Sequence, residues 1–391
     1  MINKRSLIGG LLSTRAFTFF ICHHNDIPRG IISILDLGSQ NLISPRIVRN
    51  LRRMGSDRGY NVADGSVSEN VNLGYLDVLD EHDGIHRIAY HFFDSRSEIS
   101  DRDPSFGQSP RDDDGFNNFP VTRKADTTII FLPGLLSSMT GTKSKALLQY
   151  CQGRCHSYLC FDYRGHGESD GKFEECNIHD WMNDSRSIIN FAVSKSHYGE
   201  GKGSINTSNE KSASPNIILV GSSMGSWIAL NLALEFSHLI SAVIGIGSAI
   251  DFTRHLYQNN LTNEQRALWK EDLTNSRKSE NEFVMVSSPH LEDPFPLTRH
   301  LYESGETYLL SQDRNYEHTS NKKLKCAIRL LHGVNDEIVP LSKVIDDAFL
   351  LRTKYECKDV RVRKILHGDH RLSRNEDVTV LLQALDDVLS M

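Results

Sequence analysis

The sequence predicts an α/β fold with a mostly parallel central sheet, helices on both faces and a helical cap insertion. Segments with strand-like and helix-like patterns alternate from Thr127 to Leu389. Such alternation is typical of parallel strands joined by right-handed crossovers. Within it, the motif GSSMG at residues 221–225 stands between a strand-like run and a helix-like run. The 391 residues are enough for one large domain of this kind with extensions.

The elements follow from short apolar runs and from longer helical patterns between turn-forming residues. The predicted strands are 127–132, 158–163, 216–220, 239–246, 327–331 and 360–366. The predicted helices are 143–151, 181–193, 226–236, 342–351 and 376–389. Before them, residues 71–93 predict a hairpin, because alternating apolar residues flank the turn dipeptide Asp83-Gly84.

Two segments interrupt the alternation. Residues 94–125 are polar and acidic, and we predict that they form a mobile insertion on the surface. The segment from Asp251 to Cys326 separates two strands and carries helical patterns around 261–273 and 297–310. Because it is too long for a loop, we predict a cap of residues 251–326 inserted within an α/β domain of residues 71–390.

A glycine-flanked serine between a strand and a helix is typical of a nucleophile elbow, the signature of α/β-hydrolases. The glycines allow a tight, strained turn that presents the middle residue with its side chain free. The middle residue here is Ser223, which we predict to be the nucleophile.

A serine hydroxyl needs a base, and the base needs an orienting acid, in the chain order serine, acid, histidine. Asp336 follows the strand 327–331, and His370 follows the last strand. The loops that carry these two residues should therefore lie at the carboxyl edge of the sheet, so we predict Asp336 as the acid and His370 as the base. Asp251 is the alternative acid and His367 the alternative base.

An oxyanion formed during acyl transfer needs backbone donors, each contributing roughly 10²- to 10³-fold in rate. The N–H of Met224, directly after the nucleophile, is the first predicted donor. The second is the N–H of Leu135, in the turn after the strand 127–132. Asp369 adjoins the predicted base, and we expect it to hold its own loop together rather than act in catalysis.

Composition excludes several other classes. The net charge of −6 argues against a nucleic-acid surface. No apolar run approaches the roughly 20 residues of a membrane helix. The stretch GHGESDGK at 165–172 lacks the spacing of a phosphate-binding loop, and neither a dinucleotide fingerprint nor a metal-binding spacing occurs. We therefore predict no cofactor.

Residues 1–70 form a separate extension. The first 60 residues hold nine Lys or Arg but three Asp and no Glu. Basic, acid-poor composition is typical of a mitochondrial transit peptide. A secretory signal is disfavoured, because Arg15 interrupts the apolar segment. The remaining alternative is a disordered extension on a cytoplasmic protein.

Five motifs together carry a narrower resemblance. They are FLPG at 131–134, FDYRGHGESDG at 161–171, GSSMGSW at 221–227, DEIVP at 336–340 and GDHR at 368–371. Over roughly residues 72–390 the chain resembles the abhydrolase-domain family of α/β-hydrolases, whose mitochondrial acyl-protein thioesterases remove palmitoyl groups and hydrolyse acyl glucuronides. The resemblance puts Ser223, Asp336 and His370 in the family's nucleophile, acid and base positions. Departures are the insertion 94–125, the loop 199–215 and Ser226, where a glycine is usual and where we expect a narrower pocket.

The resulting hypothesis is a serine hydrolase that cleaves acyl thioesters or carboxylic esters through an acyl-enzyme on Ser223. Its substrates would be acylated small molecules or S-acylated proteins. The alternatives are a serine peptidase or a general lipase or esterase of the same fold, and a non-catalytic binding module. Packing within the cap accounts for most of its large apolar residues, and any that face Ser223 would line an acyl channel. These residues are Leu268, Trp269, Phe283, Phe295, Leu297, Tyr302, Tyr308 and Leu309.

Overall fold

The computed structural model divides into two units, residues 1–58 and 59–391. In the first unit, β1 (Phe17–Phe19) pairs antiparallel with β2 (Ile32–Ile34). The described residues of the second unit are 71–79, 84–95, 127–197, 216–271, 283–289, 291, 293–312 and 323–391. Apart from β1 and β2, the predicted extension 1–70 lies outside the described residues, as do residues 96–125 of the predicted acidic insertion and the whole of the loop 199–215.

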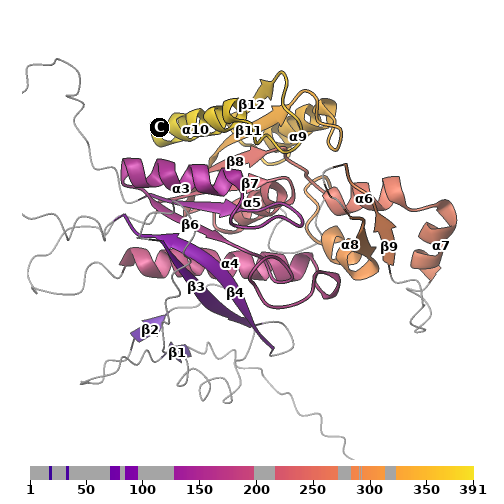
Figure 1. Cartoon of the computed structure of the whole chain (residues 1–391), viewed down its shortest axis with the longest axis horizontal. Coiled ribbons are helices and arrows are strands. Elements are labelled where there is room, and N and C mark those ends of the chain that lie inside the picture. Colours follow the sequence, from indigo (N-terminus) through magenta and orange to yellow (C-terminus); the bar gives the residue numbers. More distant parts are fainter. Residues whose placement is uncertain are drawn as a thin grey trace, which may run out of the picture. The chain divides into compact units, whose positions relative to one another are not determined.

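The second unit is built on a sheet with the strand order β12-β11-β8-β7-β5-β6-β4-β3 (Figure 1). Six of these strands run parallel, and the hairpin β3–β4 joins antiparallel to β6. The α/β fold with a mostly parallel sheet is therefore confirmed. The strands are β3 (Asn72–Leu79), β4 (Ile85–Phe93), β5 (Thr127–Leu132), β6 (Ser157–Phe161), β7 (Asn216–Ser222), β8 (Ile240–Ile246), β11 (Ala327–Gly333) and β12 (Val360–Ile365).

Helices cover both faces of the sheet. On one face, α3 (Thr142–Arg154) and α10 (Asn375–Leu389) pack on a core that includes Leu147 and Leu385. The opposite face carries α4 (Ile178–His197), α5 (Met224–Glu235) and α9 (Leu341–Thr353). Nearly all of α5 is buried, as a helix between two packed layers must be. Its first residue therefore has a fixed position at the edge of the sheet.

Between β8 and β11 the chain leaves the sheet, and its elements group beside it in Figure 1. They are α6 (Phe252–Asn260), α7 (Asn263–Glu271), β9 (Phe283–Val286), β10 (Phe295–Thr298) and α8 (Arg299–Glu306). The helix α6 and the antiparallel pair β9–β10 were not predicted. Strands of four residues are too short to show an alternating pattern, which explains why they were missed. Among the described residues, no helix is both long and apolar enough to cross a membrane.

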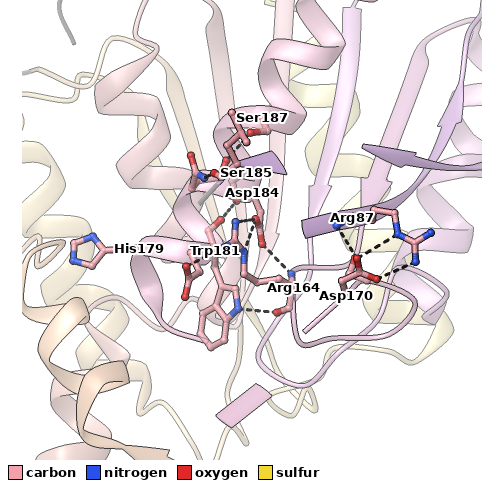
Figure 2. Close-up of polar contacts among 12 residues, drawn as sticks. Arg87, Arg164, Asp170, His179, Trp181, Asp184, Ser185 and Ser187 are labelled. Atoms are coloured by element: carbon pink, nitrogen blue, oxygen red, sulfur yellow. Dashed lines mark hydrogen bonds and ion pairs between the residues drawn. The ribbon is translucent and has the colours of Figure 1, made fainter. Parts of the chain in front are cut away.

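A buried ion pair joins the loop after β6 to α4 (Figure 2). The guanidinium of Arg164 donates to Asp184 from Nε at 2.9 Å and from Nη2 at 2.8 Å, and its Nη1 reaches the half-buried Asp180. The carbonyl of Arg164 accepts a bond from Trp181 Nε1 at 3.1 Å. These bonds fix Arg164, and with it the start of the loop after β6, against α4.

We expect Asp184→Asn to lower the free energy of unfolding by about 3 kcal/mol, because it leaves the Arg164 charge buried with a weakened partner. Urea unfolding measures the loss. The matched control is Asp170→Asn, which removes the exposed ion pair with Arg87 that Figure 2 also shows and should change stability little. Equal losses in the two variants would contradict the expectation.

Candidate active site

Ser223 lies at the turn between β7 and α5, with a backbone φ of 51° and ψ of −114°. Few non-glycine residues adopt this region, and strain of this kind gathers at functional sites. The flanking glycines are required by close contacts. A Cβ on Gly221 would lie 2.4 Å from the carbonyl oxygen of Gly225, and one on Gly225 would lie 2.2 Å from that of Leu132. The turn is therefore compressed between α5 and β5.

The structure brings His370 to this serine. His370 Nε2 lies 3.0 Å from Ser223 Oγ, and His370 Nδ1 lies 2.8 Å from Asp336 Oδ2. An ionised carboxylate only accepts hydrogen bonds, so Nδ1 carries the proton in the neutral ring. Nε2 is then the acceptor for the serine hydroxyl, which is the arrangement a general base requires.

Asp336 is anchored by its own loop. Its Oδ1 accepts bonds from the N–H groups of Ile338 and Val339, both at 2.9 Å. Burial alone would raise the pKa of Asp336, but the bond from His370 and these two backbone donors outweigh it, so the pKa lies below its usual value. The carboxylate is therefore charged at neutral pH and oriented toward the imidazole.

A second histidine supports this loop, and its part was not anticipated from the sequence. His332 on β11 is fully buried, and its Nε2 donates to the carbonyl of Val339 at 2.9 Å. The same nitrogen lies 3.6 Å from Asp336 Oδ2. Burial lowers the pKa of His332, so the ring stays neutral beside the carboxylate. The spacing of four residues between His332 and Asp336 was the available signal.

The alternative acid Asp251 and the alternative base His367 take no part in the hydrogen bonds that join Ser223, His370 and Asp336. Asp251 is buried, and its carboxylate accepts the N–H groups of Leu310 at 2.8 Å and Ser311 at 3.0 Å. It thereby ties the start of the inserted segment to its end. His367 is exposed, and the Oδ1 of Asp369 accepts the N–H of Leu372 at 2.9 Å within its own loop.

The two predicted oxyanion donors border the same space. Met224 is the first residue of α5, where backbone N–H groups have no partner within the helix. The turn that carries Leu135 lies against the nucleophile, since a Cβ on Gly134 would be 3.4 Å from Ser223 Cβ. Leu135, Met224 and Ser223 all line one cavity.

Asp162 holds the turn after β5 in place. Its buried carboxylate accepts the N–H of Met139 at 2.6 Å and that of Glu168 at 3.0 Å. Burial raises the pKa of Asp162, although both backbone bonds oppose the shift. One carboxylate thus joins the loops after β5 and β6, which explains why an aspartate follows β6.

The cavity beside Ser223 has a volume of about 720 Å³, within the range of about 300–1,000 Å³ typical of small-molecule sites. One part of its wall is polar and includes Lys143, His255 and Arg371. The apolar part comes mainly from the turns after β5, β8 and β11, from α6, and from β9, β10 and the segment between these two strands. It includes Leu135, Leu136, Ile250, Phe252, Leu256, Val286, Leu291, Phe295, Ile338 and Val339.

Ser226 and the large apolar residues of the predicted cap contribute little to this pocket. Ser226 was expected to narrow it, but Ser226 is fully buried and donates to Ser248 Oγ at 2.8 Å against β8. That expectation was wrong, because the side chain points to the sheet. Of the eight large apolar residues in the predicted cap, only Phe295 lines the cavity. Most of the others pack within the segment, as in the stack of Tyr302 on Tyr257 with ring centroids 4.0 Å apart.

Comparisons with known proteins agree with this fold. Residues 127–285 match the family model for the α/β-hydrolase fold. The human mitochondrial palmitoyl-protein thioesterase ABHD10 is 30% identical over 266 residues, which is 67% of this chain and 72% of the human protein. The mouse protein of the same name is 31% identical over 261 residues, 67% of this chain and 74% of the mouse one. The solved structure of mouse α/β-hydrolase domain-containing protein 10 superposes with a TM-score of 0.55 at 24% identity, covering 81% of this chain and 98% of that one.

The fold and these relatives define an enzyme of the hydrolase class. The chain belongs to the α/β-hydrolase family, in the group that contains the mitochondrial ABHD10 proteins. The mitochondrial location predicted from the N-terminal composition is confirmed by these relatives, which carry that location in their names.

Proposed function

We propose that this hydrolase cleaves acyl thioesters or carboxylic esters through an acyl-enzyme on Ser223. The observation that carries the proposal is the continuous chain of hydrogen bonds from Ser223 Oγ through the imidazole of His370 to Asp336, at 3.0 and 2.8 Å. Such a chain makes a serine hydroxyl nucleophilic at neutral pH.

In the first half of the proposed reaction, Ser223 Oγ attacks the acyl carbon while His370 Nε2 takes the hydroxyl proton. The N–H groups of Met224 and Leu135 stabilise the charge on the carbonyl oxygen. The tetrahedral intermediate then collapses. The bond to the leaving thiol or alcohol breaks, and His370 returns the proton to that group.

In the second half, a water molecule replaces the leaving group. His370 takes a proton from the water, which attacks the acyl-enzyme, and the carboxylic acid leaves as Ser223 regains its proton. Asp336 stays ionised throughout and stabilises the imidazolium that forms twice in the cycle.

The apolar wall of the cavity supports an acyl chain as the group bound beside Ser223. Burial of one methylene group contributes about 0.8 kcal/mol. The relatives are named palmitoyl-protein thioesterases, so S-acylated proteins and acylated small molecules, including the acyl glucuronides implied by the resemblance, are the proposed substrates. A peptidase of the same fold is the second candidate, and amide substrates separate the two.

We expect kcat/KM to rise with acyl length across a series of acyl thioesters, by up to about fourfold per methylene, before it levels off. Amides with the same acyl groups should be nearly inert, because their leaving group is poorer. The measurement is thiol release for thioesters and amine release for amides. A flat or falling series would argue for a small polar pocket, and rapid amide cleavage would favour the peptidase.

A pair of variants ties this preference to the cavity. Leu256→Ala removes part of the apolar wall and should reduce kcat/KM for long chains more than for short ones. Leu268→Ala removes an exposed leucine on α7 that does not line the cavity and should leave the series unchanged. Equal effects of the two variants on the series would place the acyl chain elsewhere.

A further inference from the structure

The loop that carries His370 is tied to a distant helix by one half-buried lysine. Lys143 lies in the first turn of α3, and its Nζ donates to the carbonyl oxygen of Arg371 at 2.6 Å. The same ammonium group donates to Ser373 Oγ at 3.3 Å, and that hydroxyl donates to the same Arg371 carbonyl at 3.1 Å. The carbonyl one residue after the predicted base therefore accepts two bonds, one of them from a cation.

We propose that Lys143 is a positioning residue for the reaction, which holds the His370 imidazole at hydrogen-bond distance from Ser223 by fixing the backbone directly after it. The inference rests on the proposed function. The lysine acts through the loop and is separated in sequence from Arg371 by 228 residues, so only the folded sheet brings the two together.

The geometry explains why such a tether matters. The imidazole must meet Ser223 Oγ and Asp336 Oδ2 at once, and these two atoms belong to different loops. Within its own loop, the Oδ1 of Asp369 binds the N–H of Leu372, which closes the turn without attaching it to α3. Misplacement of a catalytic group by about 1 Å can cost roughly 100-fold in rate. A charged donor suits this task because charge-assisted hydrogen bonds are about twice as strong as neutral ones.

The charge on this lysine is sensitive to pH. Burial lowers the pKa of Lys143 to about 8, although Asp369 and Asp377 act to raise it, and the nearby Arg371 lowers it further. Lys143 is thus charged below that pH and neutral above it. The charge-assisted bond to the Arg371 carbonyl becomes an ordinary one as the pH rises.

The decisive experiment measures kcat and KM for a thioester from neutral to alkaline pH in wild type, Lys143→Met and Lys143→Arg. We expect Lys143→Met to lower kcat by about 10- to 100-fold with KM within about twofold. Wild-type kcat should fall toward the Lys143→Met value as the pH rises through about 8. Lys143→Arg should restore most of kcat at neutral pH and hold it through this range, because a guanidinium keeps its charge.

Two controls keep the outcomes distinct. Lys145→Met removes an exposed lysine from the same helix and should behave as wild type. Ser223→Ala, assayed in parallel, must lose turnover. If Ser223→Ala loses turnover but Lys143→Met retains wild-type kcat, the positioning role of Lys143 is overturned while the proposed function stands. The role is also overturned if wild type and Lys143→Arg share the same alkaline decline, a comparison that needs no folded methionine variant. Turnover by Ser223→Ala would overturn both.

Discussion

Ser223→Ala is expected to reduce turnover of a thioester or p-nitrophenyl ester by about 10⁴- to 10⁶-fold. The variant removes the only atom that forms the proposed acyl-enzyme. The fold should persist, because the hydroxyl is lost from a side chain at the cavity and the strained backbone of the turn is set by its glycine neighbours. Initial rates and a thermal unfolding curve measure the two parts of the expectation.

A covalent label separates loss of the nucleophile from general damage. A fluorophosphonate should react with wild type at Ser223, located by peptide mass analysis, and should not react with Ser223→Ala. Ser222→Ala is the matched control, because Ser222 is the neighbouring serine and ends β7. Labelling of Ser223→Ala at wild-type rate would move the nucleophile elsewhere. Failure of the wild-type protein to react would favour the non-catalytic binding module.

The second large effect is expected from Asp336→Asn, with kcat reduced by about 10⁴-fold. The amide can donate a hydrogen bond to His370 Nδ1, which favours the ring tautomer with the proton on Nε2. That nitrogen then cannot accept the proton of Ser223. The side chain keeps its size, so its neighbours Ile338 and Val339 should stay in place, and KM should change far less than kcat.

Asp251→Asn is the natural comparison, because Asp251 is the alternative acid. It binds two backbone N–H groups of the segment around Leu310 rather than His370. We expect a modest loss of stability, measured by urea unfolding, and kcat within about tenfold of wild type, since no atom of the hydrogen-bond chain changes. A larger kcat loss for Asp251→Asn than for Asp336→Asn would transfer the acid to Asp251.

Local patterns determined much of the fold. Buried strands such as β5 and β7 appear as short apolar runs, and helices such as α10 appear through their longer apolar spacing, so both were predicted within a few residues. The boundaries moved where the turn geometry decides them. The helix α5 begins at Met224 rather than Ser226, because Ser223 already occupies the first position outside the helix.

The candidate site was accessible to sequence reasoning for a similar reason. The glycines around Ser223 and the chain order of serine, aspartate and histidine are short-range features of turns that follow strands. Parallel strands end at one edge of the sheet, so residues after β7, β11 and β12 are neighbours whatever the intervening chain contains.

Contacts between segments that are far apart in the chain could not be predicted from local patterns. The wall that β9 and β10 add to the cavity and the inward orientation of Ser226 depend on packing among side chains far apart in sequence. Such packing leaves no periodic trace along the chain.

The sequence by itself determined the class of fold, the elbow at Ser223 and the two loops that face it, because strand and helix periods and glycine-bounded turns are encoded locally. Only the tertiary structure decided that Asp336 rather than Asp251 meets His370, that α6 and the β9–β10 pair line the cavity, and that Lys143 reaches the carbonyl of Arg371. Each of these contacts joins atoms that come within a few ångströms of one another only when the helices pack on the two faces of the sheet. Such contacts depend on the close packing of the whole core, so no single segment of the chain specifies them.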